Sequence, residues 1–391
     1  MPIRIEAGRV SSLALLEAEW RALELRAPQA PIFQGWSWMG CLAAERFPSP
    51  VVVRAEVDGV VAGFALFNRR AGRLFLSESG QDRLDAPFIE HNAPLIAADA
   101  PSGLLPGMMR AAWRSGLVWG MTLGGVPPEV AAAAGGFAWQ RRERSAPYVD
   151  LDAVRAAGGD YLATLSANTR QQIRRSLRFH AARGAVRLER ATDAAGALAW
   201  FTELTRLHGE TWRRRGKPGA VAESFALRFH QALVAQGVPR GEVDILRASA
   251  GGAPFGYLYN LRRGGAVFAY QGGWKLDGAE REGRPGIVCH LLAIEPLQRP
   301  IPARLGSAVR RLAGCAGPYH TWPNSRRSRV KEVQASSRSR GRRSAMRSTS
   351  AARRSSRRST AATVSAAIPS ENPTRYSERP KRSALPATFG S

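Results

Sequence analysis

The sequence predicts an α/β (α+β) fold with mixed sheets flanked by helices, followed by a basic tail. Helical patterns and hairpin strands alternate over roughly the first 300 residues, as in proteins that pack helices on a sheet. Three strands joined by short turns then lead into a helix, over residues 242–296. After Pro300 the composition changes abruptly, and Arg and Ser dominate. These three observations fix the expected fold class and its boundaries.

The N-terminal residues begin with a helix over 11–26, which carries Leu and Trp on one face. Ser11 or Ser12 is suited to cap its start. Three aromatic residues follow closely, Phe33, Trp36 and Trp38. We expect them to pack in the core of a second short helix, and a stacking platform for a carbohydrate or a base is the alternative.

Hairpin strands and further helices continue to about residue 150. We expect strands at 51–56, 60–67, 74–76 and 117–123, helices at 103–115 and after Pro128, and an Asp58-Gly59 turn. Asp82 and Asp85 occur in a polar stretch that is more typical of a solvated loop than of a substrate site.

A second helical block begins near residue 161, and Ser166 or Asn168 is a plausible cap for its basic helix. Arg170, Arg174 and Arg178 repeat every fourth residue. They form either a solvated basic face or a stripe that faces an anionic ligand, such as a phosphorylated cofactor or an acidic glycan.

Two more helices are expected at 194–214 and 224–236, and each contains a histidine. His208 is a candidate acid or base, although a lone histidine beside Trp212 is more typical of a packed residue. His230 lies in the second helix.

The stretch 264–296 is the best candidate for a ligand site. A short apolar strand, 266–270, is followed by a polar, Gly-rich loop and then by a helical pattern that Pro285 opens. The free N–H groups at such a helix start bind anions, phosphates in particular.

Several short motifs occur in one order along residues 10–296, and their shared order resembles a known family. They are Trp20, Pro31-Ile32-Phe33-Gln34, Trp36-Ser37-Trp38, Leu165-Ser166, the segment Thr169–Leu177, His208 with Trp212 and Gly216, Gly252-Ala253-Pro254, Tyr270-Gln271-Gly272-Gly273-Trp274 and Arg284-Pro285-Gly286. The chain resembles GNAT-superfamily N-acyltransferases, in particular the acetyltransferase branch linked to bacterial cellulose and exopolysaccharide production (CelD-like). The resemblance implies tandem GNAT-like domains at 1–150 and 151–299.

The resemblance also implies an activity and a site. The activity is transfer of an acetyl or acyl group from acyl-CoA, as a co-substrate without metal, to an amine of a small molecule, glycan or peptide. The strand would follow the pantetheine arm, the helix start would take the pyrophosphate, and a base would deprotonate the amine. The implied residues are Phe268, Ala269, Arg284, Pro285, Gly286, Ile287 and Val288 for the cofactor, Tyr270 and His208 for catalysis, and Arg170, Arg174 and Trp274 for the substrate.

Composition limits location and partners. The net charge is +26, of which the 20 Lys and Arg and three Glu of residues 301–391 contribute the larger part. The three cysteines are widely spaced, which excludes a disulfide framework. The sequence shows neither an apolar signal segment nor a spanning helix, so we expect a cytoplasmic protein.

Residues 300–391 form the expected disordered tail, because Leu, Ile, Val and Phe make up only 10 of the last 91 residues. Three interpretations compete: a basic arm that binds nucleic acid or an anionic surface, a linker without function, and a change of reading frame near residues 296–310. The third is favoured, since Pro296 and Pro300 are expected to break the last helix. It would remove the next strand and inactivate the enzyme. Nucleic-acid binding through the tail, or a non-catalytic binding module, are therefore the alternative functions.

Overall fold

A computed structural model gives the structure of the chain, and it describes residues 2–85, 88, 91–217, 219, 224–276, 278, 280–298, 311–314 and 326–336. Met1–Ser339 forms one compact unit. The second unit, Arg340–Ser391, lies outside the described residues. The expectation of a disordered tail therefore concerns residues that are mostly not described.

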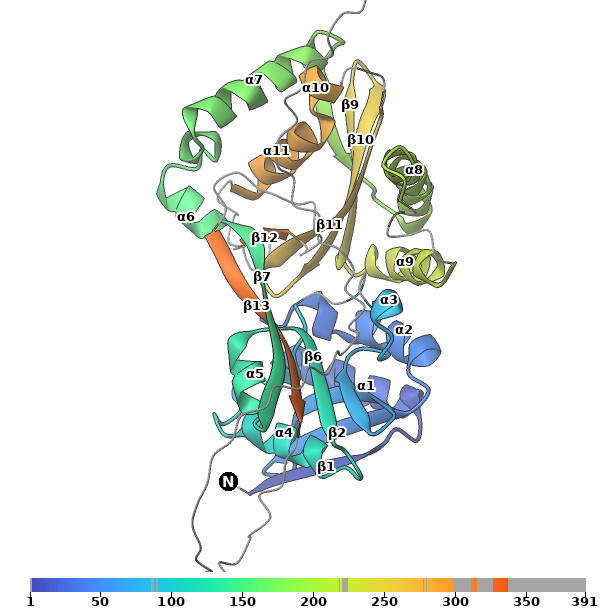
Figure 1. Cartoon of the computed structure of the whole chain (residues 1–391). Helices are drawn as coiled ribbons and strands as arrows, with labels where there is room; N and C mark the ends of the chain where they lie inside the picture. The colour runs from blue at the N-terminus through green and yellow to red at the C-terminus, as the bar shows by residue number, and fades with distance from the viewer. Residues whose placement is uncertain are drawn as a thin grey trace, which may run out of the picture. The chain divides into compact units, whose positions relative to one another are not determined.

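The strands form one continuous sheet in the order β1-β2-β3-β4-β6-β13-β7-β12-β11-β10-β9-β8, with β5 paired to β3. Helices cover both faces of the sheet (Figure 1). This confirms the predicted mixed α/β class.

The N-terminal part of the sheet comprises the elements up to residue 133. They are β1 (Ile3–Arg9), α1 (Leu13–Arg26), η1 (Ile32–Gln34), α2 (Trp36–Arg46), β2 (Pro50–Val57), β3 (Val60–Arg70), β4 (Arg73–Leu76), α3 (Asp82–Asp85), β5 (Leu95–Ile96), α4 (Leu104–Trp113), β6 (Gly120–Val126) and α5 (Pro128–Ala133). The polar stretch with Asp82 and Asp85 is thus a short helix. Asp85 is buried, and its carboxylate accepts backbone N–H groups of the preceding loop.

Aromatic packing holds the N-terminal part together. The ring of Trp20 stacks on Phe64 of β3 with centroids 5.1 Å apart, and its indole donates to the carbonyl of Gln34. Phe33, Trp36 and Trp38 are all buried. The prediction that they pack in the core is confirmed, and the stacking platform is excluded for them.

The C-terminal part comprises the elements from residue 137 on. They are β7 (Phe137–Asp150), α6 (Leu151–Ala156), η2 (Leu162–Thr164), α7 (Ala167–Ala181), β8 (Val186–Arg190), α8 (Ala194–Arg213), α9 (Ser224–Gly237), β9 (Val243–Ala250), β10 (Ala253–Arg263), β11 (Ala266–Trp274), α10 (Glu280–Gly283), α11 (Pro285–Gln298), β12 (Arg311–Gly314) and β13 (Arg326–Ser336). The predicted antiparallel meander is present as β9-β10-β11.

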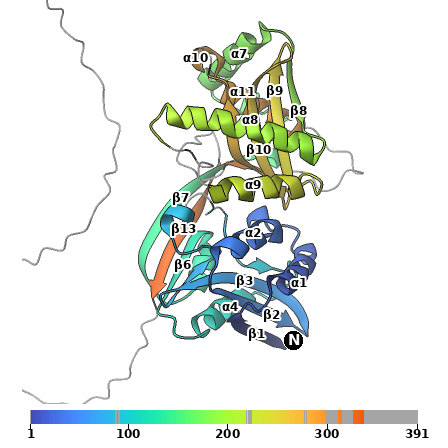
Figure 2. The same cartoon turned by 90° about the vertical axis from the view of Figure 1, so that its right-hand side faces the viewer.

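Opposite faces of this meander carry different helices. Gly273 of β11 approaches the backbone of α8 at Leu204, whereas Gly256 of β10 approaches Cys289 of α11. Gly256 pairs with Trp274, the residue after Gly273, so the two glycines face opposite sides. Figure 2 shows α8 and α9 lying across the face of β9 and β10.

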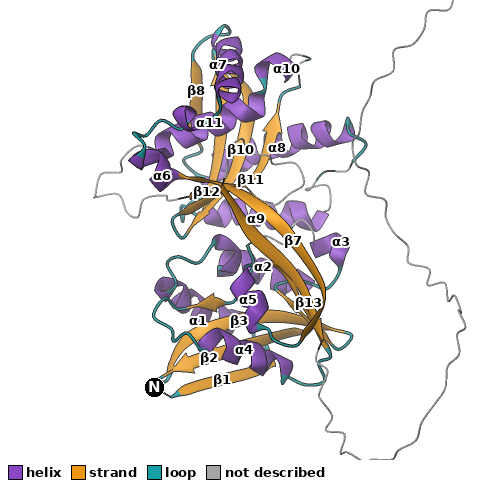
Figure 3. Cartoon of the chain, turned by 60° about the vertical axis from the view of Figure 1, so that its left-hand side comes forward, coloured by secondary structure: helices purple, strands orange, loops and turns teal. Residues whose placement is uncertain are grey.

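Long strands that the sequence analysis did not predict join the two parts. β7 pairs with β13 along most of its length and with β12 at its end. Figure 3 shows β7 and β13 side by side. Because β12 pairs in parallel with β11, the strand expected to be missing after the last helix is present. Within the expected tail, residues 311–314 and 326–336 are therefore strands.

Helix α11 also differs from its expected end. Pro296 lies inside the helix, which continues to Gln298. Proline has no N–H to donate to the carbonyl four residues earlier, so one helical hydrogen bond is lost at Pro296, and only two residues of the helix follow it. No helix in the described part of the chain is both long and apolar enough to cross a bilayer.

Candidate functional site

The edge of β11 changes partner at a bulge. β12 pairs with β11 from Ala266 to Ala269, whereas β10 pairs along the whole strand except at Tyr270, where the register shifts. From Gln271 to Trp274, β11 pairs with β10 alone among the described strands. The backbone of Phe268 and Ala269 therefore pairs with β12 on this edge. The edge that is open to a ligand begins at Tyr270.

The start of α11 lies beside this edge and has an unusual backbone. Arg284 precedes the helix with φ of 36°, a conformation that is uncommon for a side chain of this size. The amides of Ile287 and Val288 both donate to the Arg284 carbonyl, and Pro285 has no N–H. Gly286 thus carries the amide that this helix start directs outward.

The Arg284 guanidinium is directed toward helix α7. Its Nη1 donates to Oε1 of Gln172 at 2.8 Å. From the same face of α7, Ser176 donates to the Glu282 carbonyl at 3.1 Å, and Nε2 of His180 lies 2.8 Å from the Gly283 carbonyl. Helix α7 therefore fixes the turn between α10 and α11.

Trp274 fills the space between the open edge and the helix start. A Cβ built on Gly272 would lie 2.4 Å from its indole, and one on Gly286 would lie 3.2 Å from it. A Cβ on Gly256 would lie 3.0 Å from the same ring. Trp274, predicted as a substrate residue, is thus brought together with the predicted cofactor turn, in a cradle of three glycines.

His208 approaches β11 from the opposite face. Its Nδ1 lies 3.2 Å from the carbonyl oxygen of Gly272, and its ring is buried beside Trp212. A carbonyl only accepts, so Nδ1 carries the proton in the neutral ring, and Nε2 keeps its lone pair.

Tyr270 lies in a buried aromatic cluster on the α9 side of the sheet. Its ring is 4.9 Å from His230 and 5.7 Å from Trp38, measured between centroids. Nδ1 of His230 lies 3.2 Å from the hydroxyl of Tyr259. Burial lowers the pKa of His230 from 6.5 to about 3, so the ring is neutral at pH 7.

The structure does not bring Arg170 and Arg174 to the cofactor turn. Together with Arg178 they line an open groove of about 510 Å³ along α7. Gln172, which contacts the turn, is two residues away from each of them, and residues with this spacing point in nearly opposite directions on a helix. Their placement fits the solvated basic face.

Other cations are present at the turn. A cavity of about 300 Å³ is lined by Arg183, Lys275, Gly283 and Pro285, among others. Two positive side chains beside a helix start suit phosphate groups. Sequence analysis missed both, because isolated basic residues in a chain of net charge +26 give no signal. Across the residues the structure describes, no cluster of three or more His, Cys, Asp or Glu is arranged to hold a metal ion.

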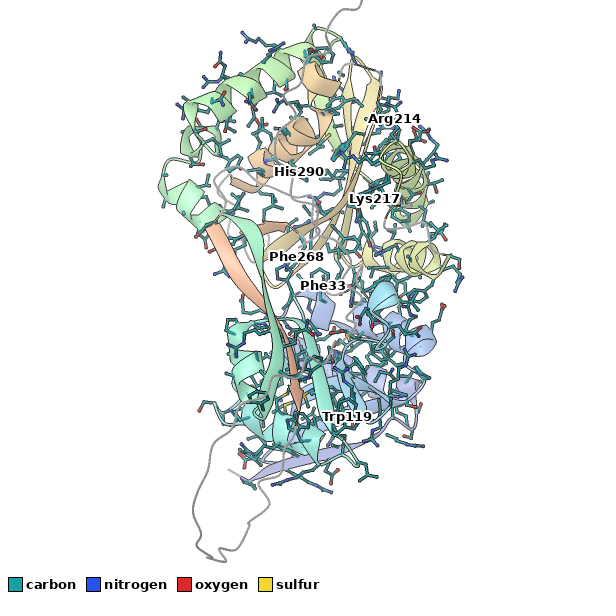
Figure 4. The ribbon with its side chains drawn as sticks, in the orientation of Figure 1. Phe33, Trp119, Arg214, Lys217, Phe268 and His290 are labelled. Carbon is teal, nitrogen blue, oxygen red and sulfur yellow. The ribbon has the colours of Figure 1, made fainter. Side chains whose placement is uncertain are left out.

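A larger cavity, of about 690 Å³, lies between the N-terminal and C-terminal parts. Phe268 lines it rather than the cofactor turn, and its ring centroid is 5.1 Å from that of Phe33 (Figure 4). His91 lines it as well. Sequence analysis also missed His91, which belongs to no motif.

The elements that surround the open edge, α7 to α11, are the ones that a family comparison identifies. Residues 167–299 match the family model of the acetyltransferase (GNAT) domain. The GNAT match thus includes the meander, the open edge and the helix start. It covers about a third of the chain and ends just after α11.

Solved structures show a likeness of fold over most of the chain. FemX is 11% identical, with 85% of this chain and 97% of FemX covered and a TM-score of 0.51. L-PGS from Bacillus licheniformis is 12% identical, covers 85% and 95%, and has a TM-score of 0.49. A tandem GNAT protein from the clavulanic acid biosynthesis pathway is 14% identical, covers 85% and 98%, and has a TM-score of 0.39.

At these identities the likeness concerns the fold, and the FemX match is the one on which it rests. The search of curated proteins found no match. Together these findings show a GNAT acetyltransferase domain match over residues 167–299 and a fold like that of FemX over most of the chain.

Proposed function

We propose that the protein transfers an acyl group, acetyl in the simplest case, from acyl-CoA to an amine. One observation carries this proposal: β11 stops pairing with β12 at Ala269 and continues to Trp274, whose ring lies against Gly286 at the start of α11. The open edge of such a strand offers backbone N–H and C=O groups that can bind the amides of the donor. The helix start beside it offers an N–H that can bind the phosphates. The GNAT family match over the same elements supports it.

The donor would lie along the open edge. The pantetheine amides would bind the backbone between Tyr270 and Trp274. The sequence had suggested residues 266–270, which come before this stretch in β11. The pyrophosphate would receive the N–H of Gly286, with charge from Arg183 and Lys275. Because the Trp274 ring rests against Gly286, it would have to leave its glycine cradle as the donor enters.

The chemistry follows from this placement. The neutral amine attacks the thioester carbonyl, a tetrahedral intermediate forms, and the C–S bond breaks to release the thiolate of coenzyme A. His208 is the proposed base, since its ring lies beside the open stretch of β11, with Nδ1 3.2 Å from the Gly272 carbonyl oxygen. Tyr270 is the second candidate. The thiolate then takes a proton from solvent.

The remaining assignments belong to the same proposal. We place the two GNAT-like domains at residues 1–150 and 151–299, and the activity in the cytoplasm. A role in exopolysaccharide or cellulose metabolism rests on the resemblance of the sequence motifs alone.

Binding of acetyl-CoA to the full chain, measured by isothermal titration calorimetry, tests the proposal. Gly286→Leu adds a side chain against the Trp274 ring at the helix start, and we expect at least a tenfold loss of affinity. Gly8→Leu is the matched control, since a Cβ there meets no atom within 4 Å. An unmodified chain that binds no acetyl-CoA, or a Gly286→Leu variant that binds normally, would refute the proposed donor site.

A further inference from the structure

Large apolar side chains are exposed together at one end of the N-terminal part of the sheet. They are Leu117, Trp119, Phe137 and Trp139, here called the exposed apolar patch, and 95%, 53%, 66% and 53% of their surfaces are exposed (Trp119 is labelled in Figure 4). Four of the eight large apolar side chains that are exposed in the described residues belong to this patch. Such a concentration marks an interaction surface, whereas exposed apolar residues that are scattered singly need no explanation.

Three segments, distant in the sequence, come together to form the patch. They are residues 69–73, 113–119 and 134–141. The backbone N–H of Trp119 donates to the Gly72 carbonyl at 2.9 Å. The Arg73 guanidinium lies 5.4 Å from the ring centroid of Trp119 and 5.9 Å from that of Trp139. One side chain thus joins all three segments, and the patch belongs to the ordered fold.

The same three segments are strongly basic. They contain no Asp or Glu and five arginines: Arg69, Arg70, Arg73, Arg114 and Arg141. Arg70, Arg114 and Arg141 are exposed. Positive charge beside exposed apolar surface fits a partner that combines negative charge with an apolar layer. The surface of a bilayer that contains anionic lipids has both, and tryptophan is enriched at that interface.

The chain leaves the described strands at this same end. Ser336, the last residue of β13, pairs with Gly120 on one side and with Phe137 on the other. Residues 337–358 follow directly and contain nine arginines and no Asp or Glu. Stable attachment to a bilayer surface takes two signals, and an apolar patch joined to a polybasic segment supplies two.

Two other partners fit this surface less well. A symmetric second copy of the chain would bring like charges together, since the three segments contain no acidic residue to pair with the arginines. Single-stranded nucleic acid would stack its bases on exposed ring faces, but Arg73 already lies over the rings of Trp119 and Trp139. Leu117, the most exposed of the four side chains, offers no ring for stacking. A lipid layer requires only apolar surface, which all four provide.

We propose that the exposed apolar patch docks on the surface of a membrane that contains anionic lipid. The four apolar side chains enter the outer part of the bilayer, and the exposed arginines of the three segments lie beside the lipid phosphates. The proposal uses no residue of the proposed donor site, so it stands or falls independently of the proposed acyl transfer.

Co-sedimentation of the full chain with increasing amounts of lipid vesicles tests the proposal. Vesicles of phosphatidylglycerol and phosphatidylcholine in equal parts should bind the chain at least tenfold more tightly than vesicles of phosphatidylcholine alone, because only the former are negatively charged. We expect Leu117→Glu to weaken binding to the mixed vesicles at least tenfold, since a charge replaces an inserted apolar side chain. Leu25→Glu is the matched control. Leu25 is 85% exposed, and its neighbour Arg26 donates to the Val61 carbonyl, at the end of β3 far from the patch. We expect this variant to change binding less than twofold.

Thermal melting of each variant establishes that it folds, and Phe137→Glu repeats the test at a second exposed position with the same expected loss. Failure of the unmodified chain to bind the mixed vesicles overturns the proposal, as does equal binding to both kinds of vesicle. Equal binding by Leu117→Glu and Phe137→Glu also overturns it and assigns the attachment to residues 337–358 alone. A fluorescent oligouridine that Leu117→Glu binds more weakly, with vesicle binding unchanged, assigns the patch to nucleic acid instead. A dimer in light scattering that Leu117→Glu dissociates, without vesicle binding, assigns it to a second copy.

Discussion

Protonation of His230 should couple folding stability to pH. In the folded protein burial lowers the pKa of His230 to about 3, whereas the unfolded chain takes up that proton near pH 6.5. Between these values the unfolded state binds one proton more than the native state, so stability falls as the pH falls. Each pH unit corresponds to ~1.4 kcal/mol for one group. His230 alone therefore costs roughly 2 kcal/mol of stability between pH 6.5 and pH 5.

The variant His230→Phe removes this contribution. Phenylalanine retains the aromatic packing against Phe88 and Tyr270 but loses the hydrogen bond with Tyr259, which lowers stability at pH 7 by about 1 kcal/mol. Between pH 7 and pH 5 its stability should fall by roughly 2 kcal/mol less than that of the unmodified chain. Urea unfolding of the full chain at both pH values, followed by tryptophan fluorescence, measures the difference.

A buried neighbour supplies the control. Phe229→Leu lowers stability through lost packing beside His230 and leaves the pH dependence unchanged. If His230→Phe and the unmodified chain lose the same stability on going to pH 5, then His230 is not held neutral by burial and this reasoning is refuted.

Three further predictions follow from close contacts and from helix geometry. In Gly273→Ala, a Cβ would lie 2.5 Å from the carbonyl oxygen of Leu204, so we expect a loss of about 1–3 kcal/mol in urea unfolding; a neutral result would show that α8 moves freely away from β11. Ser166 accepts from the Thr169 amide at the start of α7, and Ser166→Ala should cost ~1 kcal/mol by the same assay. Because Arg174 faces away from the cofactor turn, Arg174→Ala should change acetyl-CoA affinity less than twofold in calorimetry, and a tenfold loss would place the phosphates on α7 instead.

Local patterns predicted the elements whose own residues determine them. The caps at Ser12 and Ser166, the Asp58-Gly59 turn and the meander before α11 all depend on neighbouring residues, and the structure confirms them. The core positions of Phe33, Trp36 and Trp38 also followed from their apolar character.

Features that depend on distant segments were not predictable in this way. β7 is polar along much of its length, and its strand conformation depends on pairing with β13, which comes from the expected tail. The same holds for β12, whose pairing with β11 moves the open edge from Phe268 to Tyr270.

The candidate site shows the same limit. Sequence spacing placed Gly286 at a helix start, which the structure confirms as a position in α11. It did not show that Trp274 rests on Gly286, nor that Arg174 lies on the other face of α7, because both depend on how helices pack. Their roles in binding remain predictions.

The insertion of β13 between β6 and β7 has a consequence for synthesis on the ribosome. Gly120 pairs with Ser336, and Phe137 pairs with that same residue from the other side. The sheet that contains the first strands of the chain is therefore complete only after residue 336 has been synthesised. Such distant pairings slow folding and leave strand edges exposed in the meantime. Exposed strand edges make a nascent chain prone to aggregation, so we expect this chain to be at risk until residue 336 has left the exit tunnel.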